Sequence, residues 1–150
     1  MTTALWRPHA TVATIVFDQG RYLMVEEVIG GQQVLNQPAG HIDAGESIQA
    51  AALRETLEET AWQVTLTGFL GVYVLRFPER DDAYHRYCFM AKPTGKTSNP
   101  LDSGILAAHW LSYEDITGGR FALRSPLVKR CLDDHRLGRH FPLDLIFETR

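Results

Sequence analysis

A short segment of the chain concentrates acidic side chains at fixed spacing. The fixed positions hold one glycine, one arginine and four glutamates, namely Gly40, Glu46, Arg54, Glu55, Glu58 and Glu59. Carboxylate oxygens are the ligands that Mg²⁺ and Mn²⁺ prefer, and Mg²⁺ commonly takes further ligands from water and from substrate phosphates. The segment therefore predicts a divalent-metal site suited to phosphate-ester chemistry.

A helix is needed to position these charges. Ser47 is the expected N-cap, and residues 48–60 contain no Gly or Pro and are rich in Ala, Leu and Glu. At about 100° per residue, the arginine and the three glutamates that follow it share one side of this helix. Four apolar residues fall on the opposite side and are expected to face the core, namely Ala50, Leu53, Leu57 and Ala61.

A solvated helix face is the alternative to a metal site. Arg54 and Glu58 would then form an i,i+4 ion pair worth about 0.2–0.5 kcal/mol. Glu55 and Glu59, however, form an i,i+4 pair of like charge, which opposes folding by a similar amount. Because a cation bound between the carboxylates removes that repulsion, we favour the metal site.

The register G-x5-E-x7-R-E-x2-E-E, which starts at Gly40, resembles the signature of the Nudix hydrolase family. Two positions depart from the family pattern. Thr56 stands where an aliphatic residue is usual, and Ala61 stands where glycine is usual. Glycine normally permits a left-handed end to the helix, so Ala61 predicts a reshaped or strained turn with the charges untouched.

The resemblance implies a magnesium site, with Mn²⁺ as a possible substitute. Glu58 and Glu59 are the first choice for metal ligands, and Glu55 is either a third ligand or the base that orients water. The family pattern also implies that the backbone carbonyl of Gly40 is a ligand. The register identifies the positions, and the division of labour among the three glutamates stays open.

The resemblance assigns supporting roles to other polar residues. Arg54 is expected to orient the neighbouring carboxylate, and Glu46 to brace the loop and helix through Arg54. Many relatives add an acid from a later loop. Asp102 is the best candidate for that acid, followed by Asp81 and Asp82, although a loop tip or turn cap explains Asp102 equally well.

Composition limits the remaining classes of function. The 150 residues suit one domain (1–150), are 45% hydrophobic and carry a net charge of −3, which gives no electrostatic argument for a nucleic-acid polymer as partner. Cys88 and Cys131 lack metal-binding spacing and are expected to be reduced packing residues. No signal peptide or membrane span is recognisable, so we expect a cytoplasmic monomer or homodimer without a membrane partner.

The hydrophobic pattern predicts a mixed set of strands and helices. Strands are expected over residues 9–17, 21–27, 34–37, 64–77, 84–91 and 105–111. Besides the helix over 48–60, a short helix should follow Ser112 and a last helix should run over 126–137 after Ser125. Loops are expected over 40–45, 78–82 and 93–104. These elements indicate an α/β layered domain, and the Nudix resemblance implies an α/β/α sandwich with a mixed sheet.

Residues that could contact the substrate lie on the predicted strands. Most of the aromatic residues there should belong to the core, while one or two could stack on a heterocycle: Tyr22, Tyr73, Phe77, Tyr84, Tyr87 and Phe89. Arg76, His85 and Arg86 could contact a phosphate or a ring, or could lie on a solvent-facing side of a strand.

Short sequence words outside the acidic segment resemble the bacterial NudJ-type phosphatases. These words cover residues 7–13, 25–27, 36–41, 123–128 and 141–143. That group is associated with phosphate release from nucleoside di- and triphosphates, thiamine pyrophosphate and hydroxymethylpyrimidine pyrophosphate, which implies a small phosphorylated substrate. Two alternatives stay open, namely cleavage inside a nucleotide diphosphate linkage and a Nudix-like module that binds its ligand without turnover.

Overall fold

The first two strands form a hairpin, as predicted. Strand β1 (His9–Asp18) is rich in β-branched residues and buried at its centre, and β2 (Arg21–Ile29) pairs with it antiparallel. Gln19 and Gly20 make the turn with positive φ angles of 49° and 78°. The computed structural model describes residues 3–149, so residues 1, 2 and 150 of the predicted 1–150 domain lie outside the described residues.

The other elements follow in chain order. They are β3 (Gln32–Asn36), β4 (Ala39–His41), α1 (Ile48–Thr60), β5 (Trp62–Phe77), the 3-10 helix η1 (Pro78–Arg80), β6 (Asp82–Lys96), β7 (Ile105–Leu111), α2 (Tyr113–Thr117), α3 (Pro126–Arg136) and the 3-10 helix η2 (Leu143–Leu145). Ser47, Ser112 and Ser125 cap the three α-helices with their side chains, as predicted.

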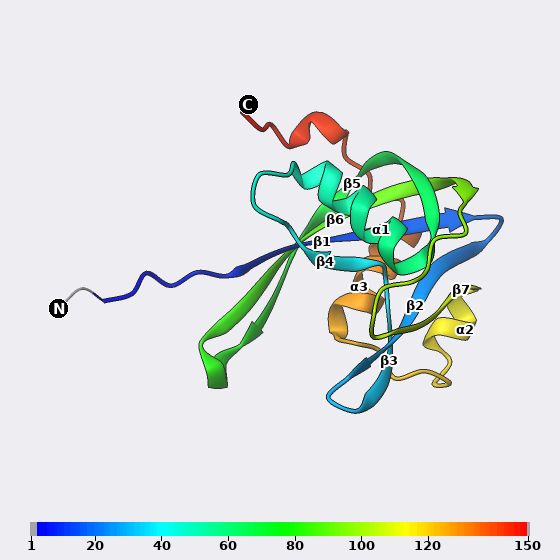
Figure 1. Cartoon of the computed structure of the whole chain (residues 1–150), viewed down its shortest axis with the longest axis horizontal. Coiled ribbons are helices and arrows are strands. Elements are labelled where there is room, and N and C mark those ends of the chain that lie inside the picture. Colours follow the sequence, from blue (N-terminus) through cyan, green and yellow to red (C-terminus); the bar gives the residue numbers. More distant parts are fainter. Residues whose placement is uncertain (1–2, 150) are drawn as a thin grey trace.

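The strands form a mixed sheet with helices on both faces (Figure 1). Within residues 3–149 the order is β3-β2-β1-β6-β5, with β4 paired to β1 and β7 to β2. The pair β1–β6 is parallel, and the other pairs are antiparallel. Consecutive residues of β1 show the two faces, because Val12 packs with helix α1 and Ala13 with the cluster of helix α3. The predicted α/β/α sandwich is confirmed.

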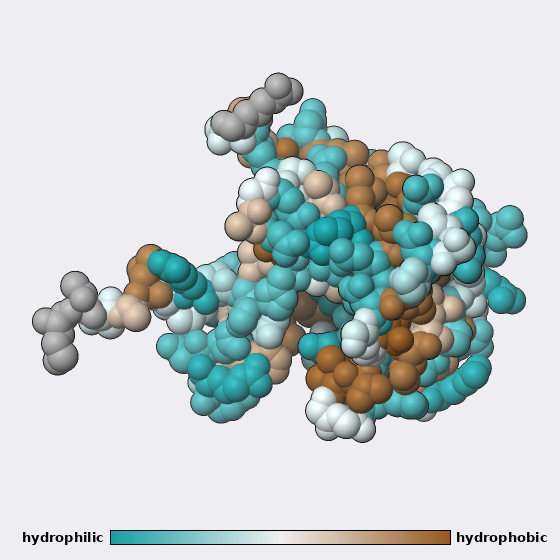
Figure 2. Space-filling model, in the orientation of Figure 1, coloured by the Kyte–Doolittle hydropathy of each residue, from teal (hydrophilic) through white to brown (hydrophobic). Residues whose placement is uncertain are grey.

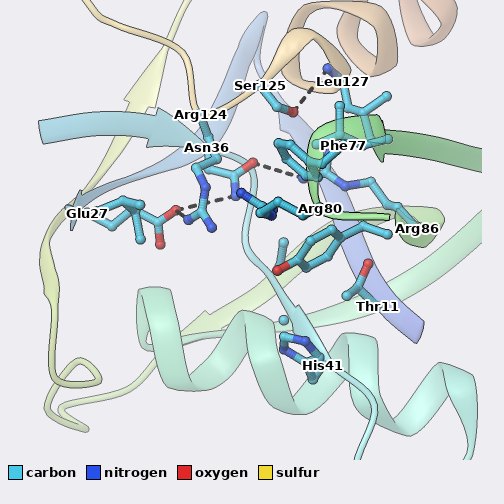
Figure 3. A pocket seen from close by; sticks show the side chains of 15 residues that line it. Thr11, Glu27, Asn36, His41, Phe77, Arg80, Arg86, Arg124, Ser125 and Leu127 are labelled. Carbon is cyan, nitrogen blue, oxygen red and sulfur yellow. Dashed lines mark hydrogen bonds and ion pairs between the residues drawn. The ribbon is translucent and has the colours of Figure 1, made fainter. Parts of the chain in front are cut away.

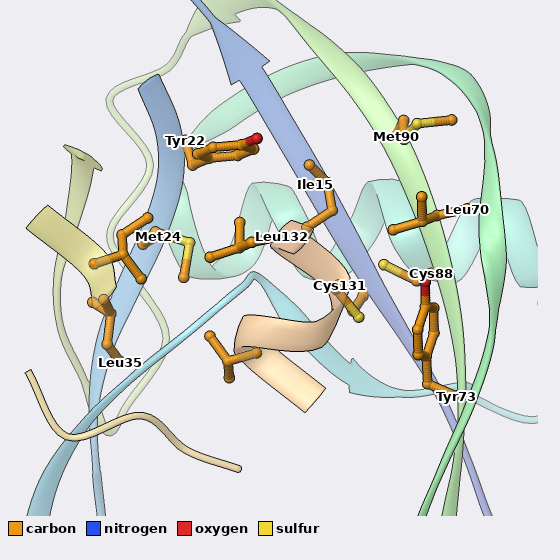
Figure 4. Packing of buried hydrophobic residues seen from close by; sticks show 13 residues of the cluster. Ile15, Tyr22, Met24, Leu35, Leu70, Tyr73, Cys88, Met90, Cys131 and Leu132 are labelled. Atoms are coloured by element: carbon orange, nitrogen blue, oxygen red, sulfur yellow. The ribbon is translucent and has the colours of Figure 1, made fainter. Parts of the chain in front are cut away.

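The core beneath α3 joins both ends of the sheet (Figure 4). Tyr22 and Met24 of β2 lie in one cluster with Leu132 of α3. Cys88 and Cys131 are also fully buried there as free thiols. Both cysteines are therefore packing residues, as the sequence predicted.

Two loop predictions need correction. Strand β6 continues through Pro93 to Lys96, so the first part of the loop predicted over 93–104 is strand. Pro93 is tolerated because it pairs with Val64 beside a register shift in the β5–β6 ladder, where a missing N–H does little harm. The loop predicted over 40–45 begins only after β4, whose three residues pair with β1.

Helix α1 has the predicted bounds but buries a different face. Ala51, Ala52 and Thr56 are completely buried, whereas Leu53 is 39% exposed. The prediction that Leu53 and Ala50 face the core was therefore wrong. The helix packs its small side chains on the sheet, which permits a close approach and turns Glu59 inward.

Both ends of helix α1 have unusual features. Ala61 adopts the left-handed conformation (φ 63°, ψ 11°), so the turn expected from glycine is kept at the expense of backbone strain. At the other end, the carboxylate of Glu148 accepts the backbone N–H of Ile48 at 3.0 and 3.2 Å. No helix among residues 3–149 has the length and apolar character that crossing a bilayer requires.

Candidate active site

Arg54 lies at the centre of the charged cluster. Its Nε and Nη2 donate to the two carboxylate oxygens of Glu46 at 2.9 and 2.6 Å. Its Nη1 donates to Glu55 at 2.9 Å and to Glu58 at 3.1 Å, and its Nη2 also donates to the carbonyl of His41 at 3.0 Å. One guanidinium therefore orients three carboxylates and ties α1 to the chain after β4.

Glu46 and Arg54 are a permanent ion pair. The hydrogen bonds from Arg54 and from the backbone N–H of Asp43 lower the pKa of Glu46 to about 2. The same pairing raises the pKa of Arg54. Both groups are charged at neutral pH, so the pair can brace the site but cannot exchange a proton during a reaction.

Glu55, Glu58 and Asp102 bring three carboxylates together. Each can present an oxygen within 4.8 Å of the other two. The loop before β7 delivers Asp102, whose backbone N–H donates to the carbonyl of Glu58 at 3.0 Å. Burial raises the pKa of Glu55 against the effect of Arg54, and Glu58 and Asp102 raise it further. Arg54 pairs with Glu55 and Glu58 of this group but is also shared with Glu46, so the acids outnumber the cation, and a divalent cation relieves that situation.

Glu59 lies deeper than these three acids, on the face of α1 that is turned to the sheet. It is 7% exposed, and its Oε1 accepts the backbone N–H of Ala39 at 2.7 Å. Burial raises the pKa of Glu59 to about 8, and the charges of Glu27 and Glu55 add to the rise. Within residues 3–149 no basic side chain forms an ion pair with Glu59. Without a bound cation, this carboxylate favours a proton.

Gly40 allows the helix to approach β4. A Cβ atom at this position would overlap the carboxylate of Glu55. The N–H and C=O of Gly40 both point toward β1. Every second residue pair of an antiparallel ladder is hydrogen-bonded, and the N–H of Ile42 donates to the carbonyl of Ala10 at 3.1 Å. Gly40, which pairs with Val12, is two residues from Ile42 and therefore belongs to a hydrogen-bonded pair as well. The Gly40 carbonyl therefore points into the sheet rather than toward the acids.

The backbone of Ala39 points the other way. Its N–H donates to Glu59, and the alternation of the antiparallel ladder places its carbonyl on the same side. The next outward-facing carbonyl, that of His41, is taken by Arg54. This geometry revises the expected Gly40 carbonyl ligand, because the carbonyl that faces the acids belongs to Ala39.

A cavity of about 590 Å³ adjoins this cluster. Ala39, Gly40 and His41 form part of its wall, so the cavity and the acids meet at β4. Its other walls carry charged, polar and aromatic side chains, among them Glu27, Asn36, Phe77, Arg80, Tyr84, Arg86 and Arg124 (Figure 3). Figure 2 shows hydrophilic residues gathered over α1 and a hollow beside them. The cavity therefore borders the strand that contacts Glu55 and Glu59.

The other predicted contact residues separate into two groups. Phe77, Tyr84 and Arg86 line the cavity. Tyr22, Tyr73 and Phe89 are buried in the core, and Tyr87 packs against the cluster beneath α1. Arg76 is exposed and His85 lies near the ring of Trp6, outside the residues that line the cavity.

The runner-up acids lie at the β5–β6 hairpin. Asp82 pairs with His9 at 3.1 Å, and Asp81 is exposed with its carbonyl accepting the Trp6 indole N–H at 2.9 Å. Neither belongs to the group formed by Glu55, Glu58 and Asp102.

Several cavity residues had no role assigned from the sequence. Glu27 accepts a hydrogen bond from Arg124 at 2.8 Å, and Asn36 lies beside them with its amide 3.5 Å from Glu27. All three fall within words that resemble the NudJ-type phosphatases. Those words were the available signal, but nothing local in the sequence shows that three segments up to 97 residues apart line one cavity.

Comparison with known proteins identifies the class of this site. The NUDIX domain model matches residues 7–131, and the chain belongs to the Nudix hydrolase family. It is therefore a hydrolase of phosphoric anhydrides, and Nudix hydrolases generally use divalent metals.

Individual relatives refine this class. The chain is 35% identical to phosphatase NudJ of Escherichia coli (strain K12) over 147 residues, which is 95% of this chain and 92% of that protein. A NUDIX hydrolase from Nitrosomonas europaea is 35% identical, with a TM-score of 0.90 over 95% of this chain and 98% of that one. A Francisella tularensis NMN adenylyltransferase/ADP ribose pyrophosphatase, complexed with AMP and a Mn ion, shares the fold at 20% identity and a TM-score of 0.62, over 91% of this chain and 43% of that one.

Proposed function

We propose that this enzyme is a magnesium-dependent phosphohydrolase that releases phosphate from nucleoside di- and triphosphates and from thiamine-related pyrophosphates. The observation that carries this proposal is the cluster of Glu55, Glu58 and Asp102, with the uncompensated Glu59 beneath it. The similarity to phosphatase NudJ over 95% of the chain supports phosphate release rather than another cleavage. The proposal includes one domain over residues 1–150 and a cytoplasmic location.

The residues present suit a hard divalent cation. Glu55, Glu58, Glu59 and Asp102 would hold it through carboxylate oxygens, and the carbonyl of Ala39 would add a neutral oxygen donor. When bound, Mg²⁺, or Mn²⁺ in its place, neutralises charge on the phosphates and acidifies water.

The protein's own groups position this chemistry. Arg54 holds Glu55 and Glu58 in place, and Glu46 holds Arg54. Glu55 is the acid whose pKa is raised while it still faces the other acids, so it is the member of the set that suits a proton acceptor for the attacking water. The missing side chain at Gly40 leaves room for that carboxylate.

A phosphate-release screen tests the proposed function. Purified enzyme is incubated with nucleoside di- and triphosphates, thiamine pyrophosphate and hydroxymethylpyrimidine pyrophosphate, with magnesium omitted in a parallel series. Magnesium-dependent release of inorganic phosphate supports the proposal. Release of pyrophosphate or of two monophosphates would show cleavage inside a diphosphate linkage, and ligand binding without any product would show a binding module.

A pair of aspartate variants tests the late acid. Asp102→Asn should lower kcat about 10-fold or more, because it removes one carboxylate from the cluster. Asp81→Asn is the matched control, since Asp81 is exposed on the β5–β6 hairpin and should keep its rate. Equal rates for the two variants would remove Asp102 from the site.

A further inference from the structure

Arg86 is a buried cation that no acid among residues 3–149 neutralises. It is 7% exposed and lines the cavity. Its Nη1 donates to Oε1 of Gln37 at 2.9 Å and its Nη2 to Oδ1 of Asn36 at 3.1 Å, and both of these acceptors are neutral amides. Nη1 also lies 3.9 Å from Sγ of Cys131, which is a weak acceptor. Within residues 3–149, no carboxylate forms an ion pair with Arg86.

The other two arginines of the cavity differ in this respect. Arg124 pairs with Glu27 at 2.8 Å, and Arg80 lies 3.5 Å from Asp82 and stacks on the ring of Phe77 at 4.0 Å. A guanidinium taken out of water is costly unless each of its N–H donors finds an acceptor. Arg86 is therefore the cavity arginine whose environment calls for a ligand.

The guanidinium is held ready for such a ligand. Gln37 is fully buried, and its Nε2 donates to the carbonyl of Val128 at 2.9 Å, which turns its Oε1 toward Arg86. The Nε–H of Arg86 has no acceptor among the described residues, and this nitrogen is not fully buried. This donor is consequently open to the cavity.

The strand register places Arg86 away from the acids. Arg86 lies beside Thr11 of β1, and Thr11 lies beside His41 of β4. Two strand spacings separate the Arg86 backbone from β4, which is about 10 Å. A phosphate held by the acids next to β4 would lie at one end of this row, and Arg86 lies at the other end.

Aromatic side chains show what kind of group fits there. Phe77 and Tyr84 line the same cavity, and their rings meet nearly edge to face with centroids 6.0 Å apart. Flat rings pack well against such walls. Resting on the proposed function, we infer that the cavity binds the heterocyclic base of the substrate, and that Arg86 determines specificity by donating to a carbonyl oxygen or ring nitrogen of that base.

Paired substrates test this assignment. The substrates are the four common nucleoside triphosphates and inorganic tripolyphosphate, which has the phosphates but no base. Arg86→Gln should raise KM for the preferred nucleotide and lower kcat/KM roughly 10- to 150-fold, the range of a lost hydrogen bond to a charged group. The loss for tripolyphosphate should stay below about threefold, because the acids and Arg54 are untouched. Arg21→Gln, which changes an exposed arginine outside this cavity, is the control.

Binding of the four nucleosides, followed by NMR, gives a readout without turnover. Wild-type enzyme should bind at least one nucleoside, and Arg86→Gln should weaken that binding. If thermal unfolding shows that Arg86→Gln is not folded, Arg86→Lys replaces it, since lysine keeps the charge but loses the planar set of donors.

The possible outcomes separate this inference from the proposed function. Equal losses for nucleotide and tripolyphosphate would make Arg86 a phosphate or structural residue and overturn the inference, as would absence of nucleoside binding by the wild type. The enzyme could instead bind nucleosides in a way that depends on Arg86 and yet hydrolyse neither substrate. This outcome would refute the proposed function but support the base-binding role of the cavity.

Discussion

Helices α1 and α3 each bury one carboxylate against the sheet, but the two acids have different partners. Asp134 of α3 is 4% exposed and accepts hydrogen bonds from the Tyr73 hydroxyl at 2.7 Å and from Nε of Arg130 at 3.1 and 3.2 Å. Glu59 of α1 is almost as buried, and the backbone N–H of Ala39 is its hydrogen-bond donor.

The pKa values of the two acids separate accordingly. Burial acts to raise the pKa of Asp134, but the hydrogen bonds from Tyr73 and Arg130 outweigh it and the pKa is lowered. Burial raises the pKa of Glu59 to about 8. A buried acid neutralised within the chain stabilises the fold, whereas one left without a cation is available to a ligand.

Glu59→Gln should have the largest effect on activity. The amide oxygen can still accept the N–H of Ala39, so the fold should persist while kcat falls more than about 100-fold, beyond the usual effect of an indirect metal contact. Steady-state hydrolysis with saturating Mg²⁺ measures the loss. Glu114→Gln, at an exposed position of α2, is the matched control. Full activity in Glu59→Gln would take Glu59 out of the metal site.

Asp134→Asn should show the opposite profile. The amide is a weaker acceptor than the carboxylate for the hydrogen bonds from Tyr73 and Arg130, so the free energy of unfolding should fall by about 2 kcal/mol. The rate per folded molecule should stay near that of the wild type, because α3 contributes none of the clustered acids. Urea unfolding measures the loss of stability, and active-site titration gives the rate per folded molecule. A large loss of kcat would show that Asp134, like Glu59, contributes to activity.

The pH dependence of stability should distinguish the two acids. Without metal, Glu59 keeps its proton in the folded state up to about pH 8, while its reference pKa is 4.5. The folded state then binds more protons between these values, so stability falls as pH rises from about 5 to 8, by about 1 kcal/mol or more. Asp134, with its lowered pKa, instead loses stabilisation as pH falls into the acid range.

Unfolding in EDTA across this pH range measures the Glu59 contribution. Glu59→Gln should abolish the loss of stability between pH 5 and 8, and saturating Mg²⁺ should stabilise the wild type across it. Identical pH profiles for wild type and Glu59→Gln would show that Glu59 titrates normally.

The smallest effects should come from the carboxyl ends of the same two helices. Ala61 ends α1 with φ 63°, and Gly138 follows α3 with φ 81°. Ala61→Gly should raise the free energy of unfolding by about 1 kcal/mol, and Gly138→Ala should lower it by about as much. Thermal unfolding measures both changes, and an unchanged midpoint for Ala61→Gly would show that the alanine turn carries no strain.

Local sequence was sufficient to predict where helix α1 begins and ends. The Ser47 cap and a run without Gly or Pro act within a few residues, and the structure has the same bounds. Its buried face could not be predicted in this way, because the contacts of Ala51 and Ala52 are with strands far away in the chain. Tertiary packing therefore overrode the apolar stripe that contained Leu53.

In the site, too, local sequence predicted the features within one helix but not the contacts between distant segments. The spacing from Glu55 to Glu59 predicted a cluster of acids, since one helix presents them. The environment of Arg86 depends on Asn36 and Gln37, which are 50 and 49 residues away. Alternation along β6 could not show which face of the strand would border a cavity.

The contact between Glu148 and the backbone of Ile48 has a consequence for helix α1. Glu148 supplies two acceptor oxygens to the first turn of the helix that carries Glu55 and Glu58. A variant that removes the Glu148 carboxylate would thus weaken the first turn of α1 from a position 100 residues away.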